Sequence, residues 1–215
     1  MERTDPGPEA ARDAARRLVA RVAFLLYDRR LTELQGGNMS VRAGRDEVAI
    51  TPTLASENNG WRLAPDDCVI HDLEGGVRAG DPKRVSRETE LHLRLYRAFA
   101  DVGSVFHLHV PEALAAAVRW SPGVVAATDE PFGAPLCLLE PGLAAQTEPH
   151  NARVEELLGQ VPRTGGAISI SPTHGIISVA PDVASNVRAV DLLRQRLEHE
   201  RVRARLRLAK ERGLG

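Results

Sequence analysis

Strand-like and helical patterns follow one another in an order that limits the folds open to this chain. Short apolar segments typical of strands recur through the middle of the sequence, whereas helical spacing of apolar residues marks both ends and the centre. The two patterns do not alternate strictly, as they do in chains built from parallel β-α-β units. We therefore predict an α/β fold in which helices cover both faces of a largely antiparallel, mixed sheet.

The predicted elements fill most of the sequence. Helices are expected over residues 9–30, 86–99, 111–119 and 181–212. Strands are expected over residues 38–42, 47–51, 68–73, 77–78, 103–110, 124–128, 134–139, 167–170 and 175–179. Residues 1–8 are expected to form a flexible tail, and residues 52–60 a polar loop. No glycine-rich dinucleotide fingerprint follows the first strand, which disfavours a nicotinamide-dependent enzyme.

Length and composition set further limits. A chain of 215 residues can bury a substantial core, and we expect residues 1–215 to form one domain. The formal net charge of −1 argues against nucleic-acid or anionic-membrane partners, which favour a basic excess. Cys68 and Cys137 form no CxxC motif, no apolar run is long enough to span a bilayer, and the N-terminus is unlike a signal peptide. These features predict a cytoplasmic protein.

Histidines form the clearest candidate for a metal site. His107 and His109 are separated by one residue in a predicted strand, so their side chains point to the same face. With His174, brought in by the fold, they would form a three-nitrogen metal site with an open position. An HxH pair can equally be two half-buried imidazoles without a metal. His71 is alone in its predicted strand and is expected to be a surface or hydrogen-bonded histidine, not a ligand. His150 lies in a polar segment with no partner in the sequence.

The start of the predicted central helix carries the candidate carboxylate. Glu88 and His92 are four residues apart, so they share one helix face. The pair is either a contact within the helix or an arrangement that aims the carboxylate at a site beyond the helix N-terminus. Ser86, in the position of a helix cap, and Arg87 would favour a phosphate or carboxylate ligand at that terminus.

A double glycine precedes the first predicted strand. Gly36 and Gly37 allow close approach of the backbone to a ligand, and Asn38 and Ser40 offer an amide and a hydroxyl. Loops of this kind suit oxyanions. The same residues are also typical of an ordinary turn, so both interpretations stay open.

Taken in order, these landmarks resemble the class II aldolase/adducin family, a group of zinc-dependent enzymes. The resemblance covers nearly the whole chain, and its motifs are Gly37-Asn38-Met39-Ser40, Ile50-Thr51-Pro52-Thr53, Ser86-Arg87-Glu88, His107-Leu108-His109 and His174-Gly175. It implies a three-layer α/β/α sandwich. It also implies a cyclic homotetramer with active sites at the subunit interfaces.

The resemblance assigns a metal centre and a proton carrier. The residues that match the family's metal-binding histidines are His107, His109 and His174. Glu88 matches the carboxylate that acts as general acid and base. The family implies Zn²⁺, although three histidines with a carboxylate also suit Mn²⁺, Co²⁺ or Fe²⁺. Such a cation would stabilise the charge of an enediolate while the carboxylate moves a proton.

The resemblance also assigns substrate contacts. The residues that match the family's phosphate-binding positions are Asn38, Thr53 and Ser86. The segment 128–133 is similar to an epimerase stretch that supplies an acidic acid/base, which implies that role for Asp129. Asp129 before Glu130 and a proline is also typical of a surface turn.

Several positions depart from the family pattern. The loop that usually reads Thr-Pro-Ser-Gly here ends in Thr53-Leu54, and a leucine side chain would obstruct a phosphate. Arg87 replaces a small hydroxylic residue, and it either binds a phosphate or carboxylate or forms a salt bridge. Gln35 stands near a threonine position of some relatives. Tyr27 and Tyr96 are the two tyrosines, so the proton-donating tyrosine near the C-terminus in relatives is missing or replaced.

We therefore predict a divalent-metal-dependent lyase of the aldolase type that acts on a small hydroxy-carbonyl compound, either a sugar phosphate or a related carboxylate. A metal-dependent epimerase, dehydratase or decarboxylase is the alternative, because these reactions share the same chemistry and a fold does not choose among them. A non-enzymatic adducin-like interaction domain is a third hypothesis. The retention of three histidines and Glu88 argues against it.

Overall fold

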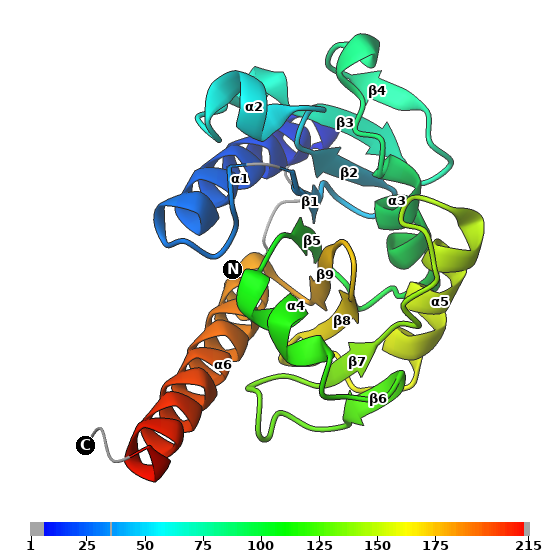
Figure 1. Ribbon diagram of the computed structural model, residues 1–215. Coiled ribbons are helices and arrows are strands. Elements are labelled where there is room, and N and C mark those ends of the chain that lie inside the picture. Colours follow the sequence, from blue (N-terminus) through cyan, green and yellow to red (C-terminus); the bar gives the residue numbers. More distant parts are fainter. Residues whose placement is uncertain (1–6, 35, 213–215) are drawn as a thin grey trace, which may run out of the picture.

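The computed structural model describes residues 7–34 and 36–212, and its central element is a nine-stranded sheet (Figure 1). The strands are β1 (Asn38–Arg42), β2 (Glu47–Ile50), β3 (Val69–Asp72), β4 (Val77–Ala79), β5 (Ser104–Leu108), β6 (Gly123–Ala126), β7 (Leu136–Leu138), β8 (Ala167–Ser171) and β9 (Gly175–Ala180). Their order in the sheet is β4-β3-β2-β1-β5-β9-β8-β7-β6. Neighbours are antiparallel except β7 and β8, which confirms the predicted mixed sheet.

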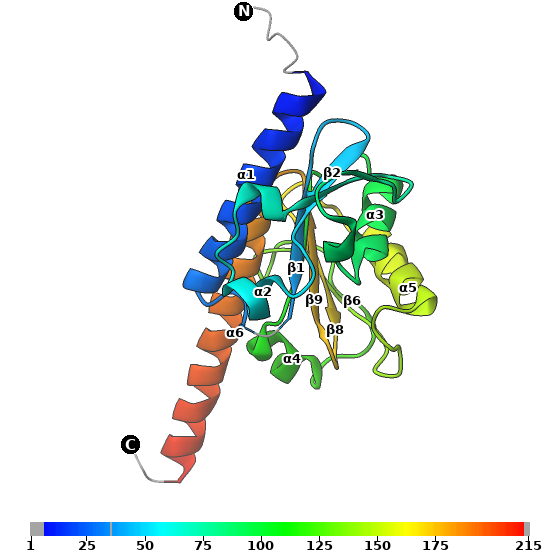
Figure 2. The same ribbon diagram turned by 90° about the horizontal axis from the view of Figure 1, so that it is seen from above.

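Helices cover both faces of this sheet. Their bounds are α1 (Pro8–Asp28), α2 (Ala55–Asn59), α3 (Thr89–Ala98), α4 (Pro111–Ala117), α5 (Glu148–Gly159) and α6 (Val183–Glu211), with 3₁₀ turns η1 (Pro65–Asp67) and η2 (Pro82–Arg84). Figure 2 shows α1 and α6 on one side of the strands and α3 and α5 on the other. The predicted three-layer α/β/α sandwich is confirmed. None of the helices in the described part of the chain is long and apolar enough to cross a membrane.

Two apolar layers separate the helices from the sheet, and β5 contributes to both. Phe106 and Leu108 pack in the layer that includes α4 and α6, whereas Val105 packs in the layer that includes α3 and α5. Because strand side chains alternate between faces, His107 shares the face of Val105, which is the face that α3 covers. Both faces of this strand are buried, as expected of a central strand.

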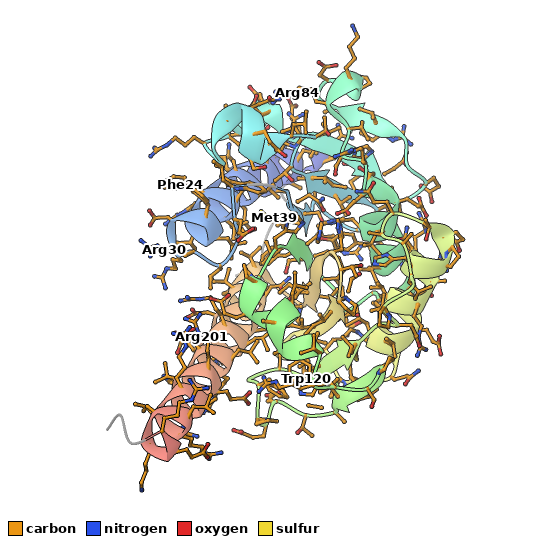
Figure 3. All side chains as sticks on the ribbon, viewed as in Figure 1. Phe24, Arg30, Met39, Arg84, Trp120 and Arg201 are labelled. Carbon is orange, nitrogen blue, oxygen red and sulfur yellow. The ribbon has the colours of Figure 1, made fainter. Side chains whose placement is uncertain are left out.

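The last helix joins the sheet through its first half and extends beyond it through its second. Its apolar contacts with the core end at Leu197, and the later turns carry exposed side chains such as Leu206. Figure 3 labels Arg201, which lies on this projecting part of α6, and Met39, which is buried on β1 in the sheet.

Local details differ from the sequence-based expectations. The short helix α2 lies inside the segment that was expected to be a polar loop. Ser86 does not cap α3, which begins at Thr89; its Oγ instead accepts a hydrogen bond from the backbone N–H of Glu88 at 3.3 Å. Most of the predicted tail, residues 1–6, and Gln35 lie outside the described residues.

Candidate metal centre and active site

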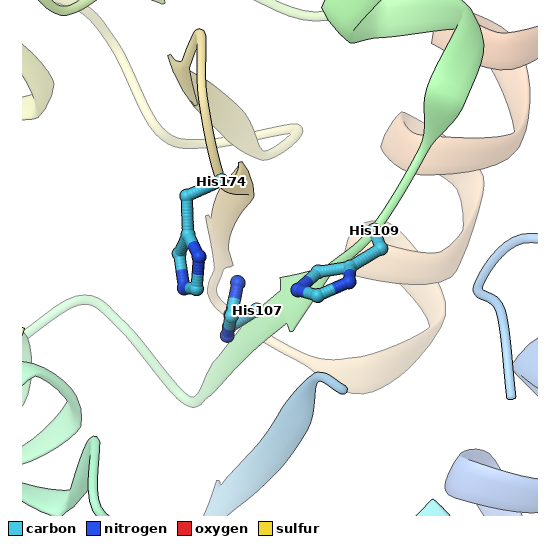
Figure 4. Close-up of side chains that lie close together, drawn as sticks. All are labelled: His107, His109 and His174. Atoms are coloured by element: carbon cyan, nitrogen blue, oxygen red, sulfur yellow. The ribbon is translucent and has the colours of Figure 1, made fainter. Parts of the chain in front are cut away.

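Three histidines meet at one end of the central strands. His107 lies near the end of β5, His109 follows that strand, and His174 lies in the turn between β8 and β9. The ring centroids are 5.1 Å (His107–His109), 4.6 Å (His107–His174) and 5.4 Å (His109–His174) apart (Figure 4). One donor atom from each ring lies within 4.8 Å of the others, so the three residues could hold a metal ion.

Glycines allow the backbone to approach these rings closely. Gly175 begins β9, and a Cβ there would lie 2.6 Å from the carbonyl oxygen of Leu108 and 2.9 Å from Nε2 of His107. Gly36 has φ of 81°, and a Cβ there would collide with the ring of His109. The double glycine that precedes β1 therefore packs against His107 and His109, a role that neither the ligand loop nor the ordinary turn of the sequence-based interpretations specifies.

The carboxylate of Glu88 lies between two of these histidines. One oxygen, Oε2, accepts hydrogen bonds from His107 Nδ1 and from Asn38 Nδ2, the latter at 2.7 Å. The other, Oε1, accepts from His174 Nε2 at 2.9 Å and from Gln146 Nε2 at 3.2 Å. Four donors thus converge on a carboxylate that is 5% exposed.

These contacts decide the charge of Glu88. Burial by itself would raise the pKa of the carboxyl group, but hydrogen bonds from His107, His174 and Asn38 outweigh it and hold the pKa of Glu88 well below its ordinary value. The group is therefore ionised at neutral pH. The sequence had left open whether desolvation or stabilisation would prevail here.

Glu88, the N-cap residue of α3, and His92, within α3, are connected through the side chain of a third residue. Asn38 lies opposite His107 in the register of β1 and β5, and its Oδ1 accepts a hydrogen bond from His92 Nε2 at 2.5 Å. Asn38 Nδ2 meanwhile donates to Glu88. The side-chain hydrogen bonds of His92 are therefore directed at Asn38 and at a serine behind it, and not at Glu88 itself.

A cavity of about 140 Å³ opens beside the three histidines. The residues that line it are Gly36, Gly37, Asn38, Pro52, Thr53, Leu54, Glu57, Ser86, Arg87, Glu88, His107, His109, Gln146 and His174. The fold thus brings the four predicted substrate-binding residues, the three histidines and Glu88 to one place. Sequence reasoning missed Gln146 and Glu57. Gln146 belongs to no motif, and a φ of 65° just before the first turn of α5 turns it towards the site.

The mouth of this cavity carries the residues that depart from the family pattern. Arg87 is exposed, and its guanidinium makes no hydrogen bond or ion pair with another residue of the described segments. Of the two alternatives for Arg87, the salt bridge is therefore not formed within these segments. Leu54 adopts the left-handed conformation, with φ of 54° and ψ of 33°, which is usual for glycine. The loop therefore keeps a glycine-like backbone while a leucine side chain stands at its edge.

Asp129 and the tyrosines lie outside this cavity. Asp129 is exposed in the segment between β6 and β7, where its carbonyl oxygen accepts a hydrogen bond from Gly133 N at 2.5 Å. It is absent from the cavity lining of the described chain, and its catalytic role stays a prediction. Tyr96 is buried with its hydroxyl bonded to Ser40, so it is not the missing proton donor of this cavity.

The donor set fits a divalent cation. Because Nδ1 of His107 donates to Glu88, Nε2 is the ring nitrogen whose lone pair can face a cation. That Nε2 is buried and has no hydrogen-bond partner in the described part of the chain. A carboxylate that orients an imidazole through its other nitrogen is the usual arrangement around metal-bound histidines. Three imidazoles and a carboxylate suit zinc and neighbouring transition metals.

This fold and site define a class of α/β/α protein with a three-histidine centre beside a buried carboxylate. The family model described as Class II Aldolase and Adducin N-terminal domain matches residues 17–200, and the chain belongs to this family. The predicted family is thereby confirmed.

Curated relatives of this family carry out different lyase-type reactions. The chain is similar to the L-fuculose phosphate aldolase of Methanocaldococcus jannaschii, with 39% identity over 39% of this chain and 42% of that protein. It is also similar to the methylthioribulose-1-phosphate dehydratase of Sorangium cellulosum, with 36% identity over 39% of this chain and 38% of that protein. These matches span about two fifths of either relative. A longer match, with 27% identity over 79% of both chains, is to the 3-oxo-tetronate 4-phosphate decarboxylase of Haemophilus influenzae.

Solved structures share the fold. An L-fuculose 1-phosphate aldolase superposes with a TM-score of 0.73 at 19% identity, over 90% of this chain and 87% of that chain. The L-fuculose-1-phosphate aldolase of Thermus thermophilus superposes with a TM-score of 0.66 at 24% identity, over 96% and 98% of the two chains. At these identities the likeness establishes the architecture alone.

Proposed function

We propose that this protein is a divalent-metal-dependent lyase of the aldolase type that acts on a small hydroxy-carbonyl compound with an anionic group. The observation that carries this proposal is the Glu88 carboxylate, buried within hydrogen-bond reach of two of the three clustered histidines. A base held beside a Lewis-acid site is the arrangement that bond cleavage next to a carbonyl requires.

Each part of the site has a distinct task in this mechanism. His107, His109 and His174 would hold the cation, which we propose to be Zn²⁺, with Mn²⁺, Co²⁺ or Fe²⁺ as alternatives. When bound, the cation would polarise the substrate carbonyl as a Lewis acid. Glu88 accepts the proton that the reaction releases, because it is ionised before the substrate enters. Gln146 donates to the same carboxylate and holds its orientation.

The opposite side of the cavity supports recognition of an anion. Arg87 presents a guanidinium without a protein partner among the described residues, and a guanidinium binds a carboxylate or phosphate through two parallel hydrogen bonds. Thr53 and Ser86 add hydroxyl groups to the same lining. The two acidic residues of the lining, Glu57 and Glu88, and the side chain of Leu54 leave less room and less positive charge for a phosphate than for a carboxylate.

Three other reactions are alternatives to aldol cleavage at this site, namely epimerisation, dehydration and decarboxylation. Because two relatives are named as a dehydratase and a decarboxylase, these reactions are included in the product analysis below. Asp129 would serve as the second acid/base of an epimerase, from a neighbouring subunit in a homotetramer with active sites at its interfaces. We further propose that the protein is cytoplasmic and acts in carbohydrate metabolism. An adducin-like interaction domain remains the non-enzymatic rival.

The first experiment is a metal analysis of protein purified without a chelating tag, by mass spectrometry. We expect about one divalent ion per chain, as a set of three histidines with an open fourth position would hold. His107→Ala should lose this ion, whereas His71→Ala, which removes a buried histidine on β3, should retain it. Protein that neither contains nor takes up a divalent ion would contradict the enzyme proposal and favour the interaction domain.

Product analysis then separates the reactions. Phosphorylated and carboxylated hydroxy-carbonyl compounds are screened with the metal-loaded protein, and aldehyde, carbon dioxide and water-loss products are followed by NMR. An aldehyde product supports the aldolase. Inversion at a carbon without cleavage, abolished in Asp129→Asn, would replace the aldolase by the epimerase.

A further inference from the structure

A chain of buried polar side chains runs from Glu88 away from the cavity into the core under α3. Asn38 Nδ2 lies 2.7 Å from Glu88 Oε2, and Asn38 Oδ1 lies 2.5 Å from His92 Nε2. On the far side of the imidazole, His92 Nδ1 lies 2.6 Å from Ser40 Oγ, which in turn lies 3.0 Å from the hydroxyl of Tyr96. The deeper members of this chain make no contact with the cavity.

The donors gathered around Glu88 fix the direction of the first hydrogen bonds in this chain. Both oxygens of Glu88 already accept hydrogen bonds from histidine or glutamine side chains. The amide of Asn38 therefore turns its NH₂ group towards Glu88 and its oxygen towards His92. The oxygen of Asn38 can only accept. His92 must therefore donate from Nε2.

The same reasoning continues into the core. Burial lowers the pKa of His92 to about 3, so the ring is neutral and carries one proton, on Nε2. Its Nδ1 then accepts from the hydroxyl of Ser40, and the oxygen of Ser40 accepts from the hydroxyl of Tyr96. His92 and Ser40 are both 0% exposed, so water does not offer either residue an alternative partner.

We propose that His92 is a positioning residue that, as the neutral Nε2–H tautomer, locks the amide of Asn38 so that its NH₂ group orients the Glu88 carboxylate. This inference rests on the proposed function in giving Glu88 the role of base. In this role His92 acts through Asn38 and contacts neither the substrate nor the cation.

The alternative orientation explains why the lock matters. If the amide of Asn38 turned over, its oxygen would face the oxygen of Glu88 and its NH₂ group would face His92. Two acceptors would then oppose each other at hydrogen-bond distance, and Glu88 would lose one of its four donors. Glu88 would then rotate more freely, and the hydrogen bond by which it orients His107 would weaken.

A spectroscopic measurement tests the tautomer without any substrate. The full chain is labelled with ¹⁵N-histidine, and the two ring nitrogens of His92 are assigned with the aid of His92→Gln. We expect the Nε2–H form near neutral pH. An Nδ1–H form would overturn the proposal, because an unprotonated Nε2 could not donate to the oxygen of Asn38. A doubly protonated ring would also overturn it, because the proposal assigns His92 a neutral ring whose Nδ1 accepts from Ser40.

Two variants test the consequence. Glutamine can donate an N–H close to the position of Nε2, whereas leucine cannot donate, so His92→Gln should keep the lock and His92→Leu should lose it. We expect His92→Leu to lower kcat about 10- to 100-fold with KM nearly unchanged, and to weaken binding of zinc alone by about 10-fold. His92→Gln should restore most of both. His71→Leu, which removes another buried histidine, should change neither.

Folding is checked by thermal unfolding and circular dichroism on each variant. Folded His92→Leu protein with unchanged zinc affinity would overturn the proposal, as would a His92→Gln variant no better than His92→Leu. The measurements of zinc affinity and of the His92 tautomer need no substrate. A negative result in either measurement is therefore distinct from a failure to find lyase activity. If the protein shows the Nε2–H tautomer and a zinc affinity that depends on His92 but has no lyase activity, the proposed function is overturned and the role of His92 stands.

Discussion

Glu88 illustrates how neighbours decide the chemistry of a single side chain. A carboxyl group that is 5% exposed would ordinarily resist ionisation, but four donors on its two oxygens reverse this tendency. The same donors orient it towards the histidines. A carboxylate held in this way begins the reaction as a base and does not need to lose a proton first.

The substitution Glu88→Gln tests this role. Glutamine places an NH₂ group where one carboxylate oxygen stood, so it both removes the base and opposes two of the donors. We expect kcat to fall about 100- to 10,000-fold, which is the range for loss of a general base, when turnover of the substrate identified by the screen is measured. Glu57→Gln changes the other carboxylate of the cavity and should change kcat less than about 10-fold. Comparable effects of the two variants would show that Glu88 has no special role.

At the scale of elements, α6 contacts both of the strands that position the three clustered histidines. Asn186, on its first turn, is 0% exposed and donates from Nδ2 to the carbonyl oxygens of Ser104 on β5 and Ser178 on β9, at 3.1 and 3.3 Å. Asp182 caps the helix and accepts from the backbone N–H of Ser185 at 2.8 Å. The start of this helix therefore fixes the pairing of β5 with β9.

Asp182→Ala should therefore destabilise the protein. The cap loses its hydrogen bond to Ser185 N and the favourable position of a negative charge at a helix N-terminus. We expect the free energy of unfolding to fall by about 1 kcal/mol, measured by urea denaturation. Asp13→Ala, which removes an exposed ion pair with Arg17 on α1, should change it by less than about 0.5 kcal/mol. Equal losses would mean that the cap contributes nothing specific.

At the scale of the whole molecule, buried histidines link stability to pH. Burial lowers the pKa values of His71, His92 and His150 below the ordinary value of 6.5. The folded protein keeps these rings neutral at a pH where the unfolded chain takes up protons. The contribution of these neutral rings to the free energy of unfolding is therefore complete above about pH 6.5. It is lost as the pH falls towards the lower pKa values that the rings have in the folded state.

We expect the free energy of unfolding of the metal-free protein to decrease between about pH 7.5 and 5.5, with a contribution from His92 that approaches about 1.4 kcal/mol per pH unit below pH 6.5. Urea denaturation at several pH values measures this slope. His92→Gln should reduce it, whereas substitution of the exposed His199 by glutamine should leave it unchanged. A stability independent of pH across this range would contradict the neutral state of the buried rings.

The sequence determined the class of fold and the centre of the site, because both depend on local periodicity. Alternation along a strand places His107 and His109 on one face, and the order of helices and strands, which do not alternate strictly, predicts a mixed sheet between helical layers. The match of ordered motifs then supplied His174 and Glu88. None of these conclusions required knowledge of a contact between distant segments.

Only the tertiary structure decided what surrounds Glu88. Its partners Asn38, Gln146 and His174 stand 50, 58 and 86 residues away in the chain, so no local pattern relates them. The charge of Glu88, the tautomer of His92 and the free guanidinium of Arg87 all follow from such distant contacts or from their absence among the described residues. Periodicity specifies which face a side chain occupies, but the energy of a buried charge depends on every donor that the fold brings to it.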